Sequence, residues 1–270
     1  MKKAYADIDE GQIHYRYAGQ GNDNIIFLHM SGSSSDEYEK VGDLLAQKNY
    51  KVFAVDLLAF GGSDNPPRFY SLEDHAKTIV EFMDAVGIDR AYLYGNMATA
   101  NMAVHIEAAY THRVKGLMLA NPLYNPDPLF YVQKRNWASF EVIETKEDGS
   151  HLLEMWLRSA KYGTSAAISD ERCRCLYNSG EWGETLHWAL FEDKPIGEYL
   201  TGIKVPTVVI AYSSLGDPAL LKEAAEMIPE GKYDIFENGN PYISRYEPER
   251  VVDMFIKHFN EVEKISDSEM

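Results

Sequence analysis

Apolar residues along the chain gather in short, continuous runs that recur at intervals. Six such runs occupy residues 25–30, 52–57, 91–96, 116–121, 207–212 and 233–238. Continuous apolar runs of this length are typical of strands that are buried on both faces of a parallel sheet. The segment IHYRYAG, residues 13–19, instead alternates between apolar and polar positions, which predicts a strand with one exposed face.

Segments of helical character lie between these runs. Residues 71–87 open with Ser-Leu-Glu-Asp, the pattern of a capping box, and continue with apolar residues at helical spacing. Residues 98–110, 218–228 and 248–259 are also predicted to be helical. Strands that alternate with helices predict an α/β fold with a mostly parallel central sheet and helices on both faces.

One long interval, residues 123–204, contains no strand pattern. It holds all four tryptophans of the chain, Trp137, Trp156, Trp182 and Trp188. We expect several short helices here, inserted between two core strands as a lid over the end of the sheet. A purely structural insertion is the alternative. The predicted organisation is a core domain of residues 1–122 and 205–261, a helical lid of residues 123–204, and a tail of residues 262–270.

Composition narrows the classes of partner. The chain has 270 residues, and its 26 Lys and Arg against 42 Asp and Glu give a net charge of −16. This charge disfavours nucleic acid and anionic membranes, so we expect a small-molecule ligand or a partner protein. No apolar run is long enough to span a bilayer, and the N-terminus lacks a signal-peptide pattern. We expect a cytoplasmic protein in which Cys173 and Cys175 are reduced thiols.

Four segments of this chain resemble those of one large enzyme class. They are IIFLHMSGSS (25–34), VFAVDLLAFGGSDNP (52–66), VPTVVIAYSSLGDP (205–218) and FENGNPYISRYEPERV (236–251). Their order and spacing resemble the α/β-hydrolase superfamily in its lidded, single-domain form. The resemblance covers nearly the whole chain outside the predicted lid. It implies a nucleophile, an acid and a histidine base on three separate loops.

The residues at two of these three positions depart from the family pattern. GNMAT (95–99) falls on the frame Gly-x-nucleophile-x-Gly, with Met97 at the nucleophile position and Thr99 in place of the second glycine. A thioether cannot be deprotonated, so Met97 cannot perform acyl transfer. Asn240 follows Gly239 where the family has its histidine, and an amide has no titratable proton near neutral pH. We therefore interpret the triad as degenerate.

The acid position keeps its residue type. Asp217 stands where the resemblance implies the aspartate of the triad, but its usual partner is absent. Since Asp217 precedes Pro218, it also has the form of an N-cap with proline at the first helical position. Its role is thus either a remnant acid or a cap. No catalytic residue is predicted with confidence, and Met97, Asp217 and Asn240 are only the positions equivalent to the triad.

The elbow is still expected to shape a ligand site. We predict that the tight turn persists, with a left-handed backbone at Met97 and its side chain in the pocket floor. Backbone amides near Ser31 and at Ala98 are candidates for binding a carbonyl oxygen. Ligands of such sheets bind at the carboxyl ends of the strands. The predicted ligand-binding residues are therefore His29, Met30, Ser31, Asn96, Met97, Ala98 and Tyr212. Bracing of the loop is the alternative role of His29.

Three functions remain open at this point. The first is a non-catalytic pseudo-hydrolase that binds a small, largely apolar molecule, or a partner protein, under the lid. The second is an enzyme of lyase, isomerase or cyclase type in which Asp217, His29 or Tyr212 acts as acid or base. The third is a hydrolase that uses an unconventional residue. We expect neither a cofactor nor a metal, because the histidines do not occur at metal-ligand spacing.

Overall fold

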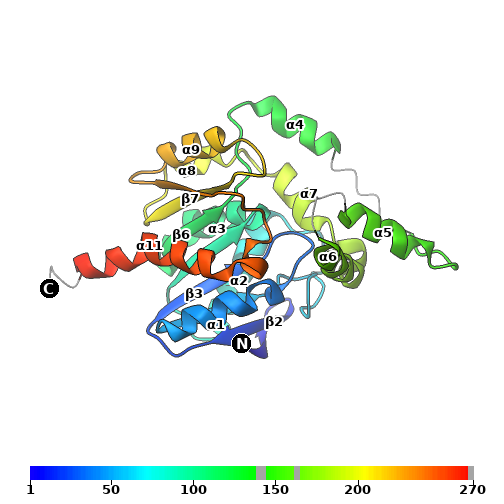
Figure 1. Cartoon of the computed structure of the whole chain (residues 1–270), viewed down its shortest axis with the longest axis horizontal. Coiled ribbons are helices and arrows are strands. Elements are labelled where there is room, and N and C mark those ends of the chain that lie inside the picture. The colour runs from blue at the N-terminus through cyan, green and yellow to red at the C-terminus, as the bar shows by residue number, and fades with distance from the viewer. Residues whose placement is uncertain (138–143, 161–164, 267–270) are drawn as a thin grey trace.

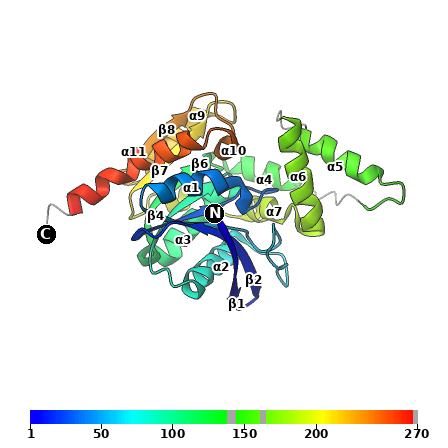
Figure 2. The same cartoon turned by 60° about the horizontal axis from the view of Figure 1, so that its bottom comes forward.

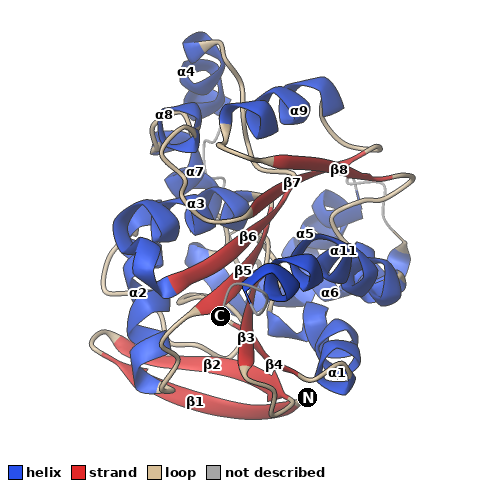
Figure 3. Ribbon diagram, turned by 90° about the vertical axis from the view of Figure 1, so that its left-hand side faces the viewer, coloured by secondary structure: helices blue, strands red, loops and turns tan. Residues whose placement is uncertain are grey.

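One sheet of eight strands, in the order β1-β2-β4-β3-β5-β6-β7-β8, forms the centre of the part of the chain that the structure describes (Figure 3). The computed structural model describes residues 1–137, 144–160 and 165–266. The strands are β1 (Lys2–Ile8), β2 (Gly11–Ala18), β3 (Asp23–Leu28), β4 (Tyr50–Val55), β5 (Ala91–Asn96), β6 (Val114–Ala120), β7 (Thr207–Tyr212) and β8 (Lys232–Phe236). The pairs β1–β2 and β2–β4 are antiparallel, and all other pairs are parallel.

Helices cover both faces of this sheet (Figures 1 and 3). The helices outside residues 123–204 are α1 (Glu39–Gln47), α2 (Leu72–Ala85), α3 (Ala98–Tyr110), α9 (Pro218–Met227), α10 (Ile243–Tyr246) and α11 (Pro248–Ser266). The predicted capping box at the start of α2 is present, because Ser71 and Asp74 bond to each other's backbone amides. The predicted α/β class, with a mostly parallel sheet between two helical layers, is confirmed.

The two faces of the sheet bury separate apolar clusters. In β3, Ile26 and Leu28 belong to a cluster that also contains residues of α2, α3 and α9, whereas Ile25 and Phe27 belong to a second cluster with residues of α1 and α11. Successive side chains of a strand point to opposite faces, so a strand covered on both sides needs apolar residues at every position. This geometry accounts for the continuous apolar runs in the sequence.

The N-terminal strand is an element that the sequence pattern did not predict. In β1 only Ala6 is buried, and the strand pairs along one edge with β2 alone. An edge strand with little buried surface carries no apolar periodicity, which explains the omission. At the other end of the chain, α11 runs to Ser266, whereas the sequence predicts a tail from residue 262.

A group of helices, here called the insertion, connects β6 to β7. It consists of α4 (Pro128–Trp137), α5 (Ser150–Ala160), α6 (Ala166–Ser179), α7 (Thr185–Glu192) and α8 (Gly197–Leu200), with a 3-10 turn at Gly180–Trp182. Its described residues form no strand, in agreement with the sequence. In Figures 1 and 2, α5 lies outside the rest of the molecule and α6 lies between α5 and the core. Trp182 and Trp188 pack against Phe69 of the core, with ring centroids 5.1 and 6.1 Å apart.

Candidate functional site

The turn between β5 and α3 is a tight strand-to-helix elbow. A Cβ atom on Gly95 would lie 2.3 Å from the carbonyl oxygen of Thr99, so only glycine fits at this point. Met97 has φ 60° and ψ −118°, a conformation that costs a non-glycine residue about 1–3 kcal/mol. The predicted left-handed backbone at Met97 is therefore present.

The hydroxyl of Thr99 holds this elbow against the neighbouring strand. Thr99 Oγ1 accepts a hydrogen bond from the amide of Asn96 at 2.9 Å and lies 2.9 Å from the carbonyl oxygen of Leu28, at the end of β3. Through these contacts the buried side chain of Thr99 links the turn to β3. Thr99 thus fits the position of the second glycine and adds a bond that glycine cannot make.

Apolar side chains surround the position that a nucleophile would occupy. Met97 packs against a small cluster of Met30, Ile168 and Tyr242, all three of them buried. Met30 comes from the segment after β3, Tyr242 precedes α10, and Ile168 belongs to α6 of the insertion. The insertion therefore contributes directly to the wall around Met97.

The side chains at the other two triad-equivalent positions accept hydrogen bonds from nearby backbone amides. Asp217 Oδ1 accepts a hydrogen bond from the amide of Ala219 at 2.9 Å and caps α9. Asn240 Oδ1 accepts from the amide of Tyr242 at 2.9 Å, at the start of the short helix α10. Both side chains belong to exposed residues. The capping role predicted for Asp217 is confirmed. No bond among the described residues joins Asp217 or Asn240 to Met97.

The first turn of α3 and the segment after β3 supply backbone groups to the site. Ala98 is the first residue of α3, where an amide has no acceptor within its own helix. Ser31 is buried, and its carbonyl oxygen accepts a hydrogen bond from Arg172 Nη1 at 3.1 Å. Gly32 has φ 70° and lies under the same guanidinium. A Cβ atom on Gly32 would be 3.0 Å from Arg172 Nη1. Arg172 of α6 thus packs directly on the segment that carries Ser31.

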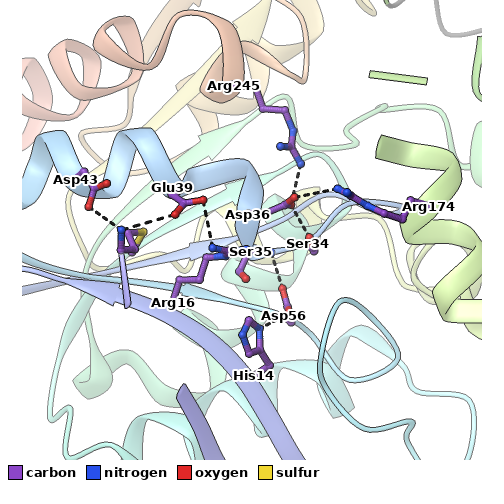
Figure 4. Close-up of polar contacts among 11 residues, drawn as sticks. His14, Arg16, Ser34, Ser35, Asp36, Glu39, Asp43, Asp56, Arg174 and Arg245 are labelled. Atoms are coloured by element: carbon purple, nitrogen blue, oxygen red, sulfur yellow. Dashed lines mark hydrogen bonds and ion pairs between the residues drawn. The ribbon is translucent and has the colours of Figure 1, made fainter. Parts of the chain in front are cut away.

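An ionic cluster fastens α6 to the core (Figure 4). The carboxylate of Asp36 lies 2.8 Å from Arg245 Nη2 of α10 and 3.5 Å from Arg174 Nη2 of α6. Arg245 Nε in turn lies 2.9 Å from Glu171 Oε2 of α6. We call these residues, Asp36, Glu171, Arg174 and Arg245, the α6 clamp. They join the insertion to the segment after β3 on the side of α6 next to Ile168.

A second acidic residue, Asp56, bonds to the segment after β3 that carries Asp36 of the clamp. The carboxylate of Asp56 accepts hydrogen bonds from His14 Nδ1 at 2.7 Å, from the amide of Gly62 at 2.8 Å and from the amide of Ser35 (Figure 4). It is almost fully buried. Asp56 therefore connects β2, the loop after β4 and the segment after β3, and its role is structural.

Comparison with known proteins identifies this architecture. Residues 23–150 match the family model described as alpha/beta hydrolase fold. The enol-lactonase from Burkholderia xenovorans superposes with a TM-score of 0.76 at 19% identity, over 95% of this chain and 100% of that one. A thermophilic esterase from Thermogutta terrifontis gives a TM-score of 0.79 at 17% identity, over 97% and 99%. The chain therefore has the α/β-hydrolase fold. The fold that the four sequence segments imply is confirmed.

Curated relatives of this α/β-hydrolase-fold protein carry the names of several different enzymes. The 2-hydroxy-6-oxononadienedioate/2-hydroxy-6-oxononatrienedioate hydrolase of Burkholderia vietnamiensis is 32% identical over 42% of this chain and 41% of its own length. Haloalkane dehalogenase 2 of Mycobacterium tuberculosis is 34% identical over 47% and 44%. The chain thus spans less than half the length of these relatives. A proline iminopeptidase of Clostridioides difficile is 22% identical over 88% and 90%.

The predicted ligand-binding residue His29 forms internal bonds in this α/β-hydrolase-fold protein. His29 is fully buried; its Nε2 accepts from the amide of Leu57 at 3.1 Å, and its Nδ1 donates to the carbonyl oxygen of Met30 at 2.8 Å. Burial lowers the pKa of His29, so the ring is neutral. Both ring nitrogens are therefore occupied, which supports the bracing role that the sequence left open.

Asn96 and Tyr212 also lie beneath the surface of the site. Tyr212 donates its hydroxyl hydrogen to Asn96 Oδ1 at 3.0 Å, and both side chains are fully buried. Burial raises the pKa of Tyr212 well above its usual value. The Asn96 side chain also donates to the carbonyl oxygen of Pro241 at 2.8 Å. These residues support the elbow from below. Of the seven predicted ligand-binding residues, all but Met97 are buried, and Met97 is partly exposed.

Glu37 is a residue of this region that the sequence did not indicate. It lies in the 3-10 helix Ser35–Tyr38 and is buried, with Oε2 accepting from Ser33 Oγ at 2.7 Å and Oε1 from Asn96 Nδ2 at 3.1 Å. Burial raises its pKa to about 7, although Arg245 opposes the rise. The surrounding letters SSSDEYEK are typical of an exposed loop, so no sequence signal marks this carboxyl group.

Within the described ranges, no group of three or more His, Cys, Asp or Glu could hold a metal ion. The same ranges contain no helix of the length and apolar character that crossing a membrane requires.

We predict that Glu37→Gln makes the folded protein more stable at pH 8 than at pH 5, relative to the unchanged chain. The pKa of Glu37 is about 7 in the folded protein and 4.5 ordinarily, so the folded state holds this proton more tightly than the unfolded chain does. The bound proton stabilises the unchanged chain fully below pH 4.5, and this stabilisation is lost as the pH rises through 7. The stabilisation that is lost corresponds to about 3 kcal/mol. Urea unfolding at both pH values measures it. Glu226→Gln, at an exposed glutamate of α9, is the control and should show no such trend.

We predict that Arg245→Met loosens α6. Because the variant removes the cation between Asp36 and Glu171, amides of α6 should exchange with deuterium about tenfold faster, while those of β5 keep their rate. Lys222→Met, which removes an exposed ion pair within α9, is the matched control. Equal protection of α6 in Arg245→Met and in the unchanged chain would contradict the clamp.

Proposed function

We propose that this α/β-hydrolase-fold protein is a non-hydrolytic member of its superfamily that binds a small, largely apolar molecule beneath the insertion. The observation that carries the proposal is the apolar wall of Met30, Met97, Ile168 and Tyr242 where a nucleophile would stand. Hydrolysis in this fold requires an oxygen or sulfur nucleophile that a base activates. Met97 supplies neither a removable proton nor a reactive anion.

The local bonds of the acid and base positions support the same proposal. Asp217 and Asn240 each accept a hydrogen bond from the amide of the residue two positions later, and Asp217 is the N-cap of α9. A triad needs an acid that orients a base and a base that reaches the nucleophile. The hydrolytic activities in the names of the relatives therefore do not transfer to this chain.

Backbone amides at the elbow favour a ligand that carries a carbonyl oxygen. The amide of Ala98 stands at the positive end of the dipole of α3, where partial negative charge is stabilised. Ser31, which is held under Arg172, is the partner segment. The proposed ligand is thus an apolar molecule with one carbonyl group, which the site binds without attacking.

Two further statements about context belong to the proposal. We place the protein in the cytoplasm because Cys173 and Cys175 are both free thiols. The net charge of −16 supports a small molecule over nucleic acid or an anionic membrane as partner. A protein ligand at the same face is the alternative to the small molecule.

A second candidate function is acid–base chemistry without a covalent intermediate. His29 and Tyr212 do not support it, because both are buried and hydrogen-bonded within the chain. Glu37 favours it, since a carboxyl group with a pKa of about 7 suits proton transfer at neutral pH. Glu37 reaches the elbow only through Asn96, however, so we rank binding above catalysis.

We predict that an apolar molecule copurifies with the protein and that Ile168→Trp excludes it. The indole would fill the space next to Met30, Met97 and Tyr242, and the amount recovered should fall about tenfold or more. Solvent extraction of the denatured protein followed by mass spectrometry measures the amount. Leu153→Trp, the same change at an exposed position of α5, is the control. Equal recovery from both variants would place the ligand elsewhere.

We predict that the unchanged chain neither reacts with a fluorophosphonate probe nor hydrolyses p-nitrophenyl butyrate. The double variant Met97→Ser, Asn240→His should acquire probe labelling, because the elbow geometry at φ 60° is retained. Mass spectrometry of the labelled protein locates the modified residue. Met97→Ser alone is the control and should react far more slowly. Labelling of the unchanged chain would favour a hydrolase with an unconventional nucleophile.

A further inference from the structure

Two buried aromatic side chains at the start of α2 have polar atoms without partners. Tyr70 and His75 form an edge-to-face pair with ring centroids 5.3 Å apart and an interplanar angle of 73°. His75 is fully buried and Tyr70 is 2% exposed. Tyr70 Oη, His75 Nδ1 and His75 Nε2 have no hydrogen-bond partner within the described chain. Three unpaired polar atoms thus lie in one small region.

Other buried rings in the same protein show how unusual this is. His29 uses both ring nitrogens, on Leu57 and Met30. Tyr38 is equally buried and donates its hydroxyl hydrogen to the carbonyl oxygen of Leu28 at 3.2 Å. More than nine in ten buried polar groups of folded proteins are paired, and an unpaired one costs on the order of 1–3 kcal/mol. The Tyr70–His75 pair therefore calls for a partner from outside the chain.

The chemistry of the two side chains limits that partner to a neutral molecule. Burial lowers the pKa of His75 to about 4, so its ring is neutral and offers one donor and one acceptor. The phenol of Tyr70 both donates and accepts. A hydroxyl group matches this set, because it also donates once and accepts. An ion would have to lose its hydration among apolar residues without a countercharge on these side chains.

We propose that Tyr70 and His75 form a binding site for the hydroxyl group of a small neutral molecule, either an organic alcohol or a water molecule. The site lies on the α2 side of the sheet, within the cluster that also contains Phe60 and Leu72. It goes beyond the ligand proposed at Met97, and either proposal can fail without the other. Phe69, the residue before Tyr70, packs on Trp182 of the insertion. The chain next to the Tyr70–His75 pair is therefore in contact with the insertion.

Tyr70→Phe tests the proposal, because removing a paired hydroxyl lowers the Tm, whereas removing an unpaired hydroxyl does not. If a hydroxyl partner is bound, loss of the phenol oxygen should lower the Tm by about 2–4 °C. If the oxygen is unpaired, its removal leaves the Tm unchanged or raises it, and this outcome overturns the proposal. Tyr38→Phe, which breaks a known bond of an equally buried tyrosine, is the matched control and should lower the Tm.

Two measurements separate the two sources of the hydroxyl group. Mass spectrometry of a solvent extract of the purified full chain detects an organic alcohol, whose amount should fall in Tyr70→Phe but not in Tyr38→Phe. High-resolution diffraction distinguishes an isolated peak next to Tyr70 Oη and His75, which identifies water, from extended density, which identifies an organic molecule. The absence of any density there, together with an unchanged Tm in Tyr70→Phe, would refute the site.

Discussion

The elbow between β5 and α3 is the constraint on which the rest of this site depends. Gly95 leaves no room for a side chain, Met97 is held at φ 60°, and Thr99 bonds the turn to β3. In an active hydrolase this strain presents a nucleophile. Here the same strain, which costs about 1–3 kcal/mol, presents the thioether of Met97. The turn persists because the packing of strand against helix fixes it from both sides.

The sequence predicted the parts of the fold that follow from burial. Continuous apolar runs identified the parallel strands, since both faces of those strands are covered. The edge strand β1 was not predicted because Ala6 is its only buried residue. At the site, the positive φ of Met97 and the helix cap at Asp217 were predicted correctly, because each depends on neighbours in the sequence: a strand-to-helix turn and a following proline. Glu37 was not predicted, because its burial and its bond to Asn96, 59 residues away, arise only in the folded chain.

The same contrast applies to the residues predicted to bind ligand. Position at the carboxyl end of a strand predicted that Asn96 and Tyr212 bind ligand, and in the structure the two side chains bond to each other. It could not indicate which way the side chains point, because that depends on the layer below the sheet end. There the Tyr212 hydroxyl, the Asn96 amide and the Glu37 carboxyl bond in series. Sequence position thus locates the site, while tertiary packing decides which groups a ligand meets.

Two of the three triad-equivalent side chains, those of Asp217 and Asn240, bond locally to the backbone. A catalytic acid or base must keep its polar atoms available, whereas Asp217 and Asn240 each accept a bond from a nearby amide. The cap at Asp217 stabilises the start of α9 by about 0.5–2 kcal/mol, comparable with the cost of the turn at Met97. The local bond at Asp217 and the strained turn at Met97 therefore contribute to the stability of the folded chain with similar magnitude and opposite sign.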